Sequence, residues 1–136
     1  MLVDDALFMR NMLRSILEME GYLVVAEAED GEDAVARYRE SRPDLVLMDI
    51  LMPVRNGIEA TRDIMEFDKN ACVVMCSIVG QEHLIKEARE AGAYGYIRKP
   101  FTPEDVMEVL NRAIAVKFPM KKGVNRKRLA ESLRGF

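Results

Sequence analysis

Five short apolar runs, separated by longer stretches of helical period, constrain the fold of this chain more than any other sequence feature. The runs contain β-branched or aromatic side chains and lie at residues 1–3, 23–26, 45–48, 71–76 and 94–97. Between them, apolar residues recur three or four positions apart, as at Met9, Leu13 and Leu17. This alternation predicts βαβ units and a parallel sheet.

The runs are nearly continuous in apolar character, which indicates a sheet covered on both faces. With right-handed crossovers, the expected architecture is a doubly wound, three-layer α/β/α sandwich. Thr102 before Pro103 has the pattern of a helix start, so the last long helix is predicted from Pro103 to about Val116. Ligands in such sheets bind at the carboxyl ends of the strands.

Composition bounds the class of protein. The chain has 136 residues, of which 49% are hydrophobic and 32% charged, as expected for one globular domain. Its apolar runs are far shorter than the roughly 20 residues that cross a bilayer. Asp4 and Asp5 argue against a cleavable leader, and Cys72 and Cys76 fit two buried thiols. We therefore expect a cytoplasmic protein without a membrane span.

Polar side chains follow four of the predicted strands. Asp4 and Asp5 follow the first, Asp49 the third, Ser77 the fourth and Lys99 the fifth. A parallel sheet would bring all of them to one edge. Carboxylates about 4 Å apart repel one another by several kcal/mol at an intermediate dielectric, so the cluster requires a cation.

The ligand chemistry favours Mg²⁺ over Zn²⁺. Hard carboxylate oxygens suit Mg²⁺, whereas a Zn²⁺ site favours histidine or cysteine, and His83 is the only histidine in the sequence. A carboxylate at this edge could accept a phosphoryl group as a nucleophile. The charges of Mg²⁺ and Lys99 would offset the charge that gathers on the transferred oxygens, to which Ser77 could donate a hydrogen bond.

Four motifs identify a family. They are LVDD at 2–5, MDILMPVRNG at 48–57, CS at 76–77 and YIRKPF at 96–101. At these separations the chain resembles the CheY-like receiver domains of two-component response regulators over residues 1–117. The resemblance implies a flavodoxin-like, five-stranded sheet with strand order 2-1-3-4-5. Residues 118–136 lie outside it as a basic C-terminal extension that could form a short helix.

The resemblance also implies roles for individual residues. Asp49 would be the phosphoacceptor, and Mg²⁺ would be held by Asp4, Asp5, Asp49 and the Leu51 carbonyl. Lys99 would contact the phosphoryl group, and its peptide bond to Pro100 would be cis.

The family implies a switch and its partners. Ser77 and the aromatic Tyr96 would couple phosphorylation to the face formed by the fourth helix, fifth strand and fifth helix. A sensor histidine kinase would be the donor and a downstream target protein would read this face. The chain would be a monomer or a phosphorylation-dependent dimer, and it would promote its own Mg²⁺-dependent phosphorylation and dephosphorylation without being an enzyme.

The sequence departs from the family pattern at several positions. Only three residues precede Asp4, so the first strand is expected to be short or to begin further upstream. Ile78 stands where a small residue is usual and would narrow access to the site. Leu51 and Val79 are apolar where some relatives carry polar groups that orient water, which predicts a long-lived acyl phosphate.

Charge separates the extension from the body. Residues 1–116 carry 13 basic and 22 acidic groups, whereas residues 117–136 carry 7 and 1. Such a tail could attract nucleic acid, an acidic partner or the acidic body itself, and we favour a solvated, partly ordered tail. It is too short for a helix-turn-helix output domain, so nucleic-acid binding is not expected.

Three functions fit these observations to different degrees. The preferred hypothesis is a phosphorylation-activated response regulator, as in chemotaxis or motility. The alternative is the receiver fragment of a DNA-binding transcriptional regulator that dimerises on phosphorylation. A phosphatase of a related doubly wound type ranks last, because Leu51 occupies the position of its general acid/base aspartate.

Overall fold

The computed structural model describes residues 1–78 and 82–119 of the chain. Within them a parallel sheet is ordered β2-β1-β3-β4-β5, as predicted. The strands are β1 (Leu2–Val3), β2 (Glu27–Ala28), β3 (Val46–Asp49), β4 (Val73–Ile78) and β5 (Gly95–Lys99). The helices are α1 (Leu7–Met19), α2 (Gly31–Ser41), α3 (Gly57–Phe67), α4 (Glu82–Glu90) and α5 (Pro103–Lys117).

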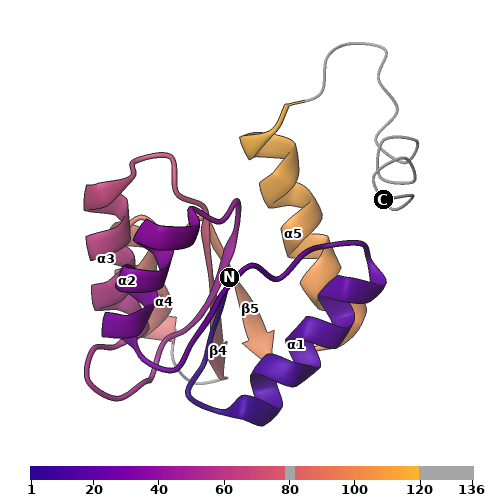
Figure 1. Cartoon of the computed structure of the whole chain (residues 1–136), viewed down its shortest axis with the longest axis horizontal. Helices are drawn as coiled ribbons and strands as arrows, with labels where there is room; N and C mark the ends of the chain where they lie inside the picture. Colours follow the sequence, from indigo (N-terminus) through magenta and orange to yellow (C-terminus); the bar gives the residue numbers. More distant parts are fainter. Residues whose placement is uncertain (79–81, 120–136) are drawn as a thin grey trace.

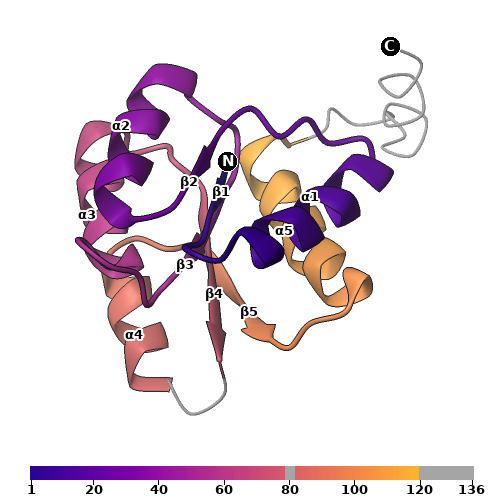
Figure 2. The ribbon, with the colours of Figure 1, turned by 60° about the horizontal axis from the view of Figure 1, so that its bottom comes forward.

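Helices cover both faces of the sheet. In Figures 1 and 2, α2, α3 and α4 lie on one side, and α1 and α5 lie on the other. Successive β3 side chains pack on opposite faces of the sheet, since Val46 and Met48 belong to one buried cluster and Leu47 to the other. This period of two in an apolar strand is what a sheet with two covered faces requires, so the predicted three-layer sandwich is confirmed.

The helix starts are encoded locally. Thr102 accepts a hydrogen bond from the Asp105 amide, and Pro103 opens α5, which confirms the predicted start; the helix ends at Lys117, one residue beyond prediction. Asn56 and Glu59 form the corresponding capping box of α3. Because these helices begin where strands end, their caps fix the loops at the carboxyl edge of the sheet.

The predicted position of the second strand is wrong. Residues 23–26 were expected to pair, but β2 is Glu27–Ala28. Its partner β1 has only two residues, Leu2 and Val3, which pair with Glu27 and Ala28. The apolar run therefore precedes the ladder, with Leu23 and Val25 exposed. The apolar pattern therefore predicted the approximate position of β2, whereas its pairing with the two-residue strand β1 determines which residues form it.

Other expectations have mixed outcomes. Cys72 and Cys76 are free and buried, as predicted, and His83 is exposed near the start of α4. The helices that the structure describes are all too short or too polar to span a lipid bilayer. Val79 and residues 120–136 lie outside the described residues, so the expectations placed on them remain predictions.

Candidate functional site

Three site residues meet at the carboxyl edge of the sheet. Asp4 follows β1, Asp49 ends β3 and Lys99 ends β5. Lys99 Nζ lies 3.0 Å from Asp4 Oδ2 and 3.2 Å from Asp49 Oδ1. Positions 95 residues apart in sequence are thus in direct contact, as the parallel topology predicts.

Asp5 completes a group of three carboxylates. One oxygen from each of Asp4, Asp5 and Asp49 lies within 4.8 Å of the others. Asp4 is buried, Asp49 is partly buried and Asp5 is exposed, so the group opens to solvent on one side. All its side-chain donors are hard oxygens, and the site faces water that could complete an octahedral shell. This donor set fits Mg²⁺.

The electrostatics of the group favour an added cation. Burial raises the pKa of Asp49 from its ordinary value of 3.8 to about 6; Lys99 counteracts this rise and the charge of Asp4 adds to it. Burial acts to lower the pKa of Lys99, but its hydrogen bond to Asp4 and the charge of Asp49 outweigh burial and raise it. One ammonium group therefore serves two carboxylates and leaves the cluster with excess negative charge.

Ser77 adds a hydroxyl without a partner. The residue is 2% exposed, it lies within β4, and its Oγ has no hydrogen-bond partner among the described residues. Ser77 is one residue past Cys76, the register partner of Asp49. A buried polar atom left unsatisfied is uncommon and costly, so this hydroxyl is available to a ligand that reaches the site.

The loop after Asp49 is held tightly. The Gly57 amide donates to the Ile50 carbonyl at 2.8 Å, and a Cβ on Gly57 would lie 2.0 Å from the Asp49 carbonyl oxygen. Val54 has φ 68°, a conformation that β-branched residues rarely adopt. Leu51 lies on this loop, and its side chain is exposed. Glycine is thus required where α3 begins against the end of β3.

Tyr96 lies apart from this contact group. It is half-buried in β5, pairs in register with Met75 and packs on the cluster beneath α2, α3 and α4. The structure shows no hydrogen bond between it and Ser77. The Lys99-Pro100 peptide bond is cis, as expected. The described geometry therefore unites Asp4, Asp49 and Lys99 but does not link Tyr96 to Ser77.

Sequence reasoning missed Arg10. This residue is 8% exposed, and its Nη1 donates to the Asp4 carbonyl oxygen at 2.7 Å. The available signal was its place on α1, because Arg10, Leu13 and Leu17 form one buried stripe at helical spacing. A charge on an apolar stripe needs a partner inside the protein.

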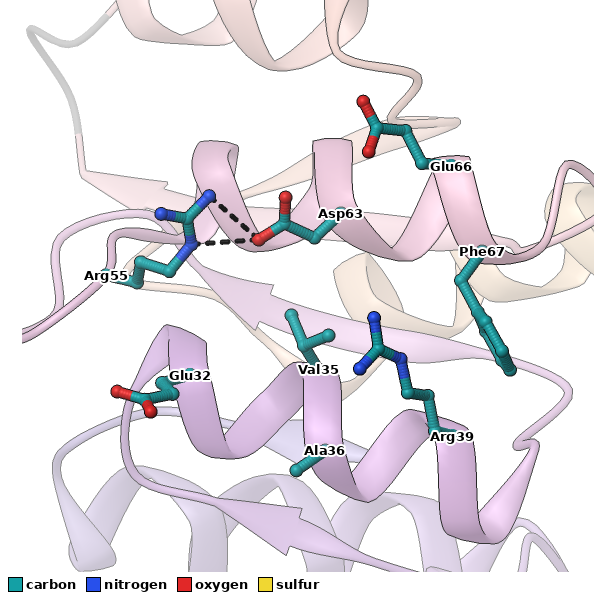
Figure 3. A pocket seen from close by; sticks show the side chains of 8 residues that line it. All are labelled: Glu32, Val35, Ala36, Arg39, Arg55, Asp63, Glu66 and Phe67. Carbon is teal, nitrogen blue, oxygen red and sulfur yellow. Dashed lines mark hydrogen bonds and ion pairs between the residues drawn. The ribbon is translucent and has the colours of Figure 1, made fainter.

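A cleft lies between α2 and α3, away from the carboxylates (Figure 3). Its volume is about 560 Å³. The Arg55–Asp63 ion pair spans part of its wall at 2.8 Å, and the Arg39 guanidinium lies 5.3 Å from the centre of the Phe67 ring. Arg55 and Asp63 are paired with each other, Arg39 lies over an aromatic ring, and none of the predicted site residues lines the cleft.

Comparisons with known proteins agree with this geometry. The family model described as response regulator receiver domain matches residues 1–111. The chain is 54% identical to chemotaxis protein CheY of Halobacterium salinarum over 111 residues, covering 82% of this chain and 92% of that protein. It is 49% identical to CheY of Thermotoga maritima, covering 82% and 93%. The crystal structure of the CheX-CheY-BeF3-Mg²⁺ complex from Borrelia burgdorferi matches with a TM-score of 0.78 and 39% identity, covering 85% of each chain.

Proposed function

We propose that this chain, which belongs to the response regulator receiver domain family, accepts its activating phosphoryl group on Asp49. It is a phosphorylation-activated response regulator of a two-component system. One observation carries the assignment of Asp49: its carboxylate lies at the carboxyl edge of the sheet, 3.2 Å from Lys99 Nζ and within 4.8 Å of two further carboxylates. Residues 1–117 would form the receiver domain and residues 118–136 its basic extension.

The chain's own groups suit a phosphoryl transfer. A carboxylate oxygen of Asp49 would form a P–O bond while the P–N bond of a donor phosphohistidine breaks. The electron pair of the P–N bond would return to the imidazole, which takes up a proton. Lys99 would turn from the carboxylates toward the phosphoryl oxygens. Ser77 would donate its unpartnered hydroxyl to one of them.

Mg²⁺ would be held by Asp4, Asp5, Asp49 and the Leu51 carbonyl. The ion supplies positive charge that offsets the negative charge developing on the phosphoryl oxygens. The fit rests on the excess negative charge of the carboxylate group, which one lysine does not balance. The response to phosphorylation would pass through Ser77 and Tyr96 to the face of α4, β5 and α5.

The partners follow from this role. Family members of this kind are signalling proteins that receive their phosphoryl group from a kinase and act on downstream targets. We assign a sensor histidine kinase as donor and a chemotaxis or motility protein as target, because the relatives are CheY proteins. Those relatives do not favour the alternative of a DNA-binding regulator. The site of action would be the cytoplasm.

The surroundings of Asp49 support a slow loss of the phosphoryl group. Leu51 stands two residues after Asp49 and Ile78 pairs in register with Lys99, and both apolar side chains are exposed, at 55% and 52%. Neither can orient an attacking water by hydrogen bonding. We propose that the acyl phosphate persists well beyond seconds, and that Leu51→Asn shortens its lifetime. Decay within seconds in the wild type would contradict this proposal.

The central experiment combines intact-protein mass and NMR shifts. Wild type, Asp49→Ala and the control Asp68→Ala are each treated with a small-molecule phosphodonor, and separately with beryllofluoride, both with and without Mg²⁺. Asp68 follows the last residue of α3 and is not one of the three clustered carboxylates. We expect wild type and Asp68→Ala to gain one phosphoryl mass and to shift their NMR spectra only when Mg²⁺ is present. Asp49→Ala should do neither. Phosphorylation of Asp49→Ala, or none of wild type, would refute the assignment.

A further inference from the structure

Arg10 carries a buried charge that the phosphoryl transfer does not use. Its side chain is 9% exposed and has two partners. Nη1 donates to the Asp4 carbonyl oxygen at 2.7 Å, and Nε donates to Glu27 Oε1 at 3.2 Å. The planar guanidinium therefore joins the turn after β1 to β2 through two of its donors.

Arg10 contacts the main-chain carbonyl of Asp4 and does not occupy its carboxylate. The Ala6 amide donates to Asp4 Oδ1 at 2.9 Å, and Lys99 Nζ lies 3.0 Å from Oδ2. In the proposed function Lys99 is needed at the phosphoryl group. Arg10 holds the main chain instead, so its bond can persist while both carboxylate oxygens change partners.

Glu27 limits the electrostatic cost of this arrangement. It accepts from Arg10 Nε at 3.2 Å and from Arg14 Nη2 at 2.6 Å. A second positive charge beside Asp4 would otherwise oppose a cation bound to the carboxylates. With Glu27 beside it, Arg10 fixes the position of the turn and contributes less positive charge to the site.

We propose that Arg10 is a positioning residue that presets the Asp4-Asp5 turn for a divalent cation, with Glu27 holding its guanidinium in place. The proposal rests on the proposed function, because it concerns the Mg²⁺ site of that function. Loss of a group that orients a metal ligand from behind typically lowers metal affinity by about 10- to 100-fold.

The test measures Mg²⁺ affinity of the unphosphorylated protein by NMR titration, with Arg10→Met and Arg14→Met as a matched pair. Both variants remove one positive charge that pairs with Glu27, but only Arg10 contacts Asp4. Charge removal alone should tighten cation binding. Loss of positioning should weaken Mg²⁺ binding by about tenfold in Arg10→Met, whereas Arg14→Met, which loses only charge, should bind at or slightly above the wild-type affinity.

Arg10→Lys provides a second variant that keeps the charge but lacks the planar fork. We expect it to weaken Mg²⁺ binding as well, and to speed hydrogen exchange of the Ala6 amide in metal-free protein, as Arg10→Met does if it folds. Wild-type or tighter Mg²⁺ binding in Arg10→Lys and Arg10→Met would overturn the proposal. Failure of the wild type to bind Mg²⁺ would instead refute the metal site of the proposed function, and with it this inference.

Discussion

The two edges of the sheet treat their buried polar groups in opposite ways. At the amino edge, where α2 and α3 end, the buried Tyr38 hydroxyl donates to Asp68 at 2.7 Å, and the Arg42 guanidinium lies 4.3 Å from the centre of the Phe67 ring. At the carboxyl edge, Asp4 and Asp49 share one lysine, and the Ser77 hydroxyl has no partner among the residues that the structure describes. The paired polar groups at the amino edge stabilise the fold. The incompletely paired groups at the carboxyl edge can instead gain interaction energy when a ligand binds.

The largest expected change in stability concerns the close approach of Gly57 to the Asp49 backbone at the carboxyl edge. In Gly57→Ala the new Cβ meets the Asp49 backbone, so we expect a loss of about 3 kcal/mol in the free energy of unfolding. Gly95→Ala is the control, because its Cβ would lie 3.7 Å from the nearest atom, on Val109. Urea unfolding followed by circular dichroism measures both. Equal stability of the two variants would show that the carboxyl edge is no more constrained than the start of β5.

Asparagine should change the stability of the protein in opposite directions at Asp49 and at Asp68. Asp49→Asn should stabilise the metal-free protein at pH 7.5 by about 1 to 2 kcal/mol, after allowance for solvent screening of the raised pKa. Asp68→Asn should destabilise it, because the hydrogen bond from Tyr38 lowers the pKa of Asp68 and favours its charged form. Thermal unfolding with a chelator present measures both shifts. Destabilisation by Asp49→Asn would show that the carboxylate is already balanced without a metal.

The same pKa fixes a pH dependence. The pKa of Asp49 is raised in the folded state to about 6, so the neutral carboxyl favours folding. Its contribution to stability is complete below about pH 4 and is lost as the pH rises through about 6. The advantage of Asp49→Asn over wild type should therefore grow between pH 4 and pH 7 in metal-free buffer. An advantage independent of pH would point to packing, not to charge.

Backbone strain at the carboxyl edge gives the next effect. Val54 has φ 68° and is exposed, so Val54→Asn should gain about 1 kcal/mol in unfolding free energy because asparagine tolerates this conformation. Val54→Ala is the control, since alanine retains most of the cost. Chemical unfolding measures the three proteins. A gain in Val54→Ala equal to that in Val54→Asn would assign the effect to removal of an exposed apolar side chain.

The smallest effect compares two buried hydroxyls. Tyr38→Phe removes a hydroxyl with a partner and should cost about 1 kcal/mol, whereas Ser77→Ala removes one that has no partner in the described part of the chain and should cost close to nothing. Ser77→Ala should nevertheless slow phosphorylation by a small-molecule donor. Equal destabilisation by the two changes would mean that Ser77 has a partner in solution, such as an ordered water.

The candidate site was predictable to the extent that it depends on strand ends. Asp4, Asp49 and Lys99 follow apolar runs, and parallel strands place such residues at one edge whatever their separation in the chain. Arg10 was not predictable in the same way, because its partner is a main-chain carbonyl that any residue type could provide. Nor could the sequence show that Ser77 would be buried without a hydrogen bond.

Hydrophobic periodicity and strand-end chemistry in the sequence therefore predict the fold class and the acidic group at the carboxyl edge, and the family resemblance predicts the strand order. These properties depend on residue type and spacing, which can be read directly. The position of β2, the burial of Arg10 and the raised pKa of Asp49 depend on which distant atoms come into contact. The length of strand pairing and the desolvation of a side chain are properties of the packed chain, so only the tertiary structure determines them.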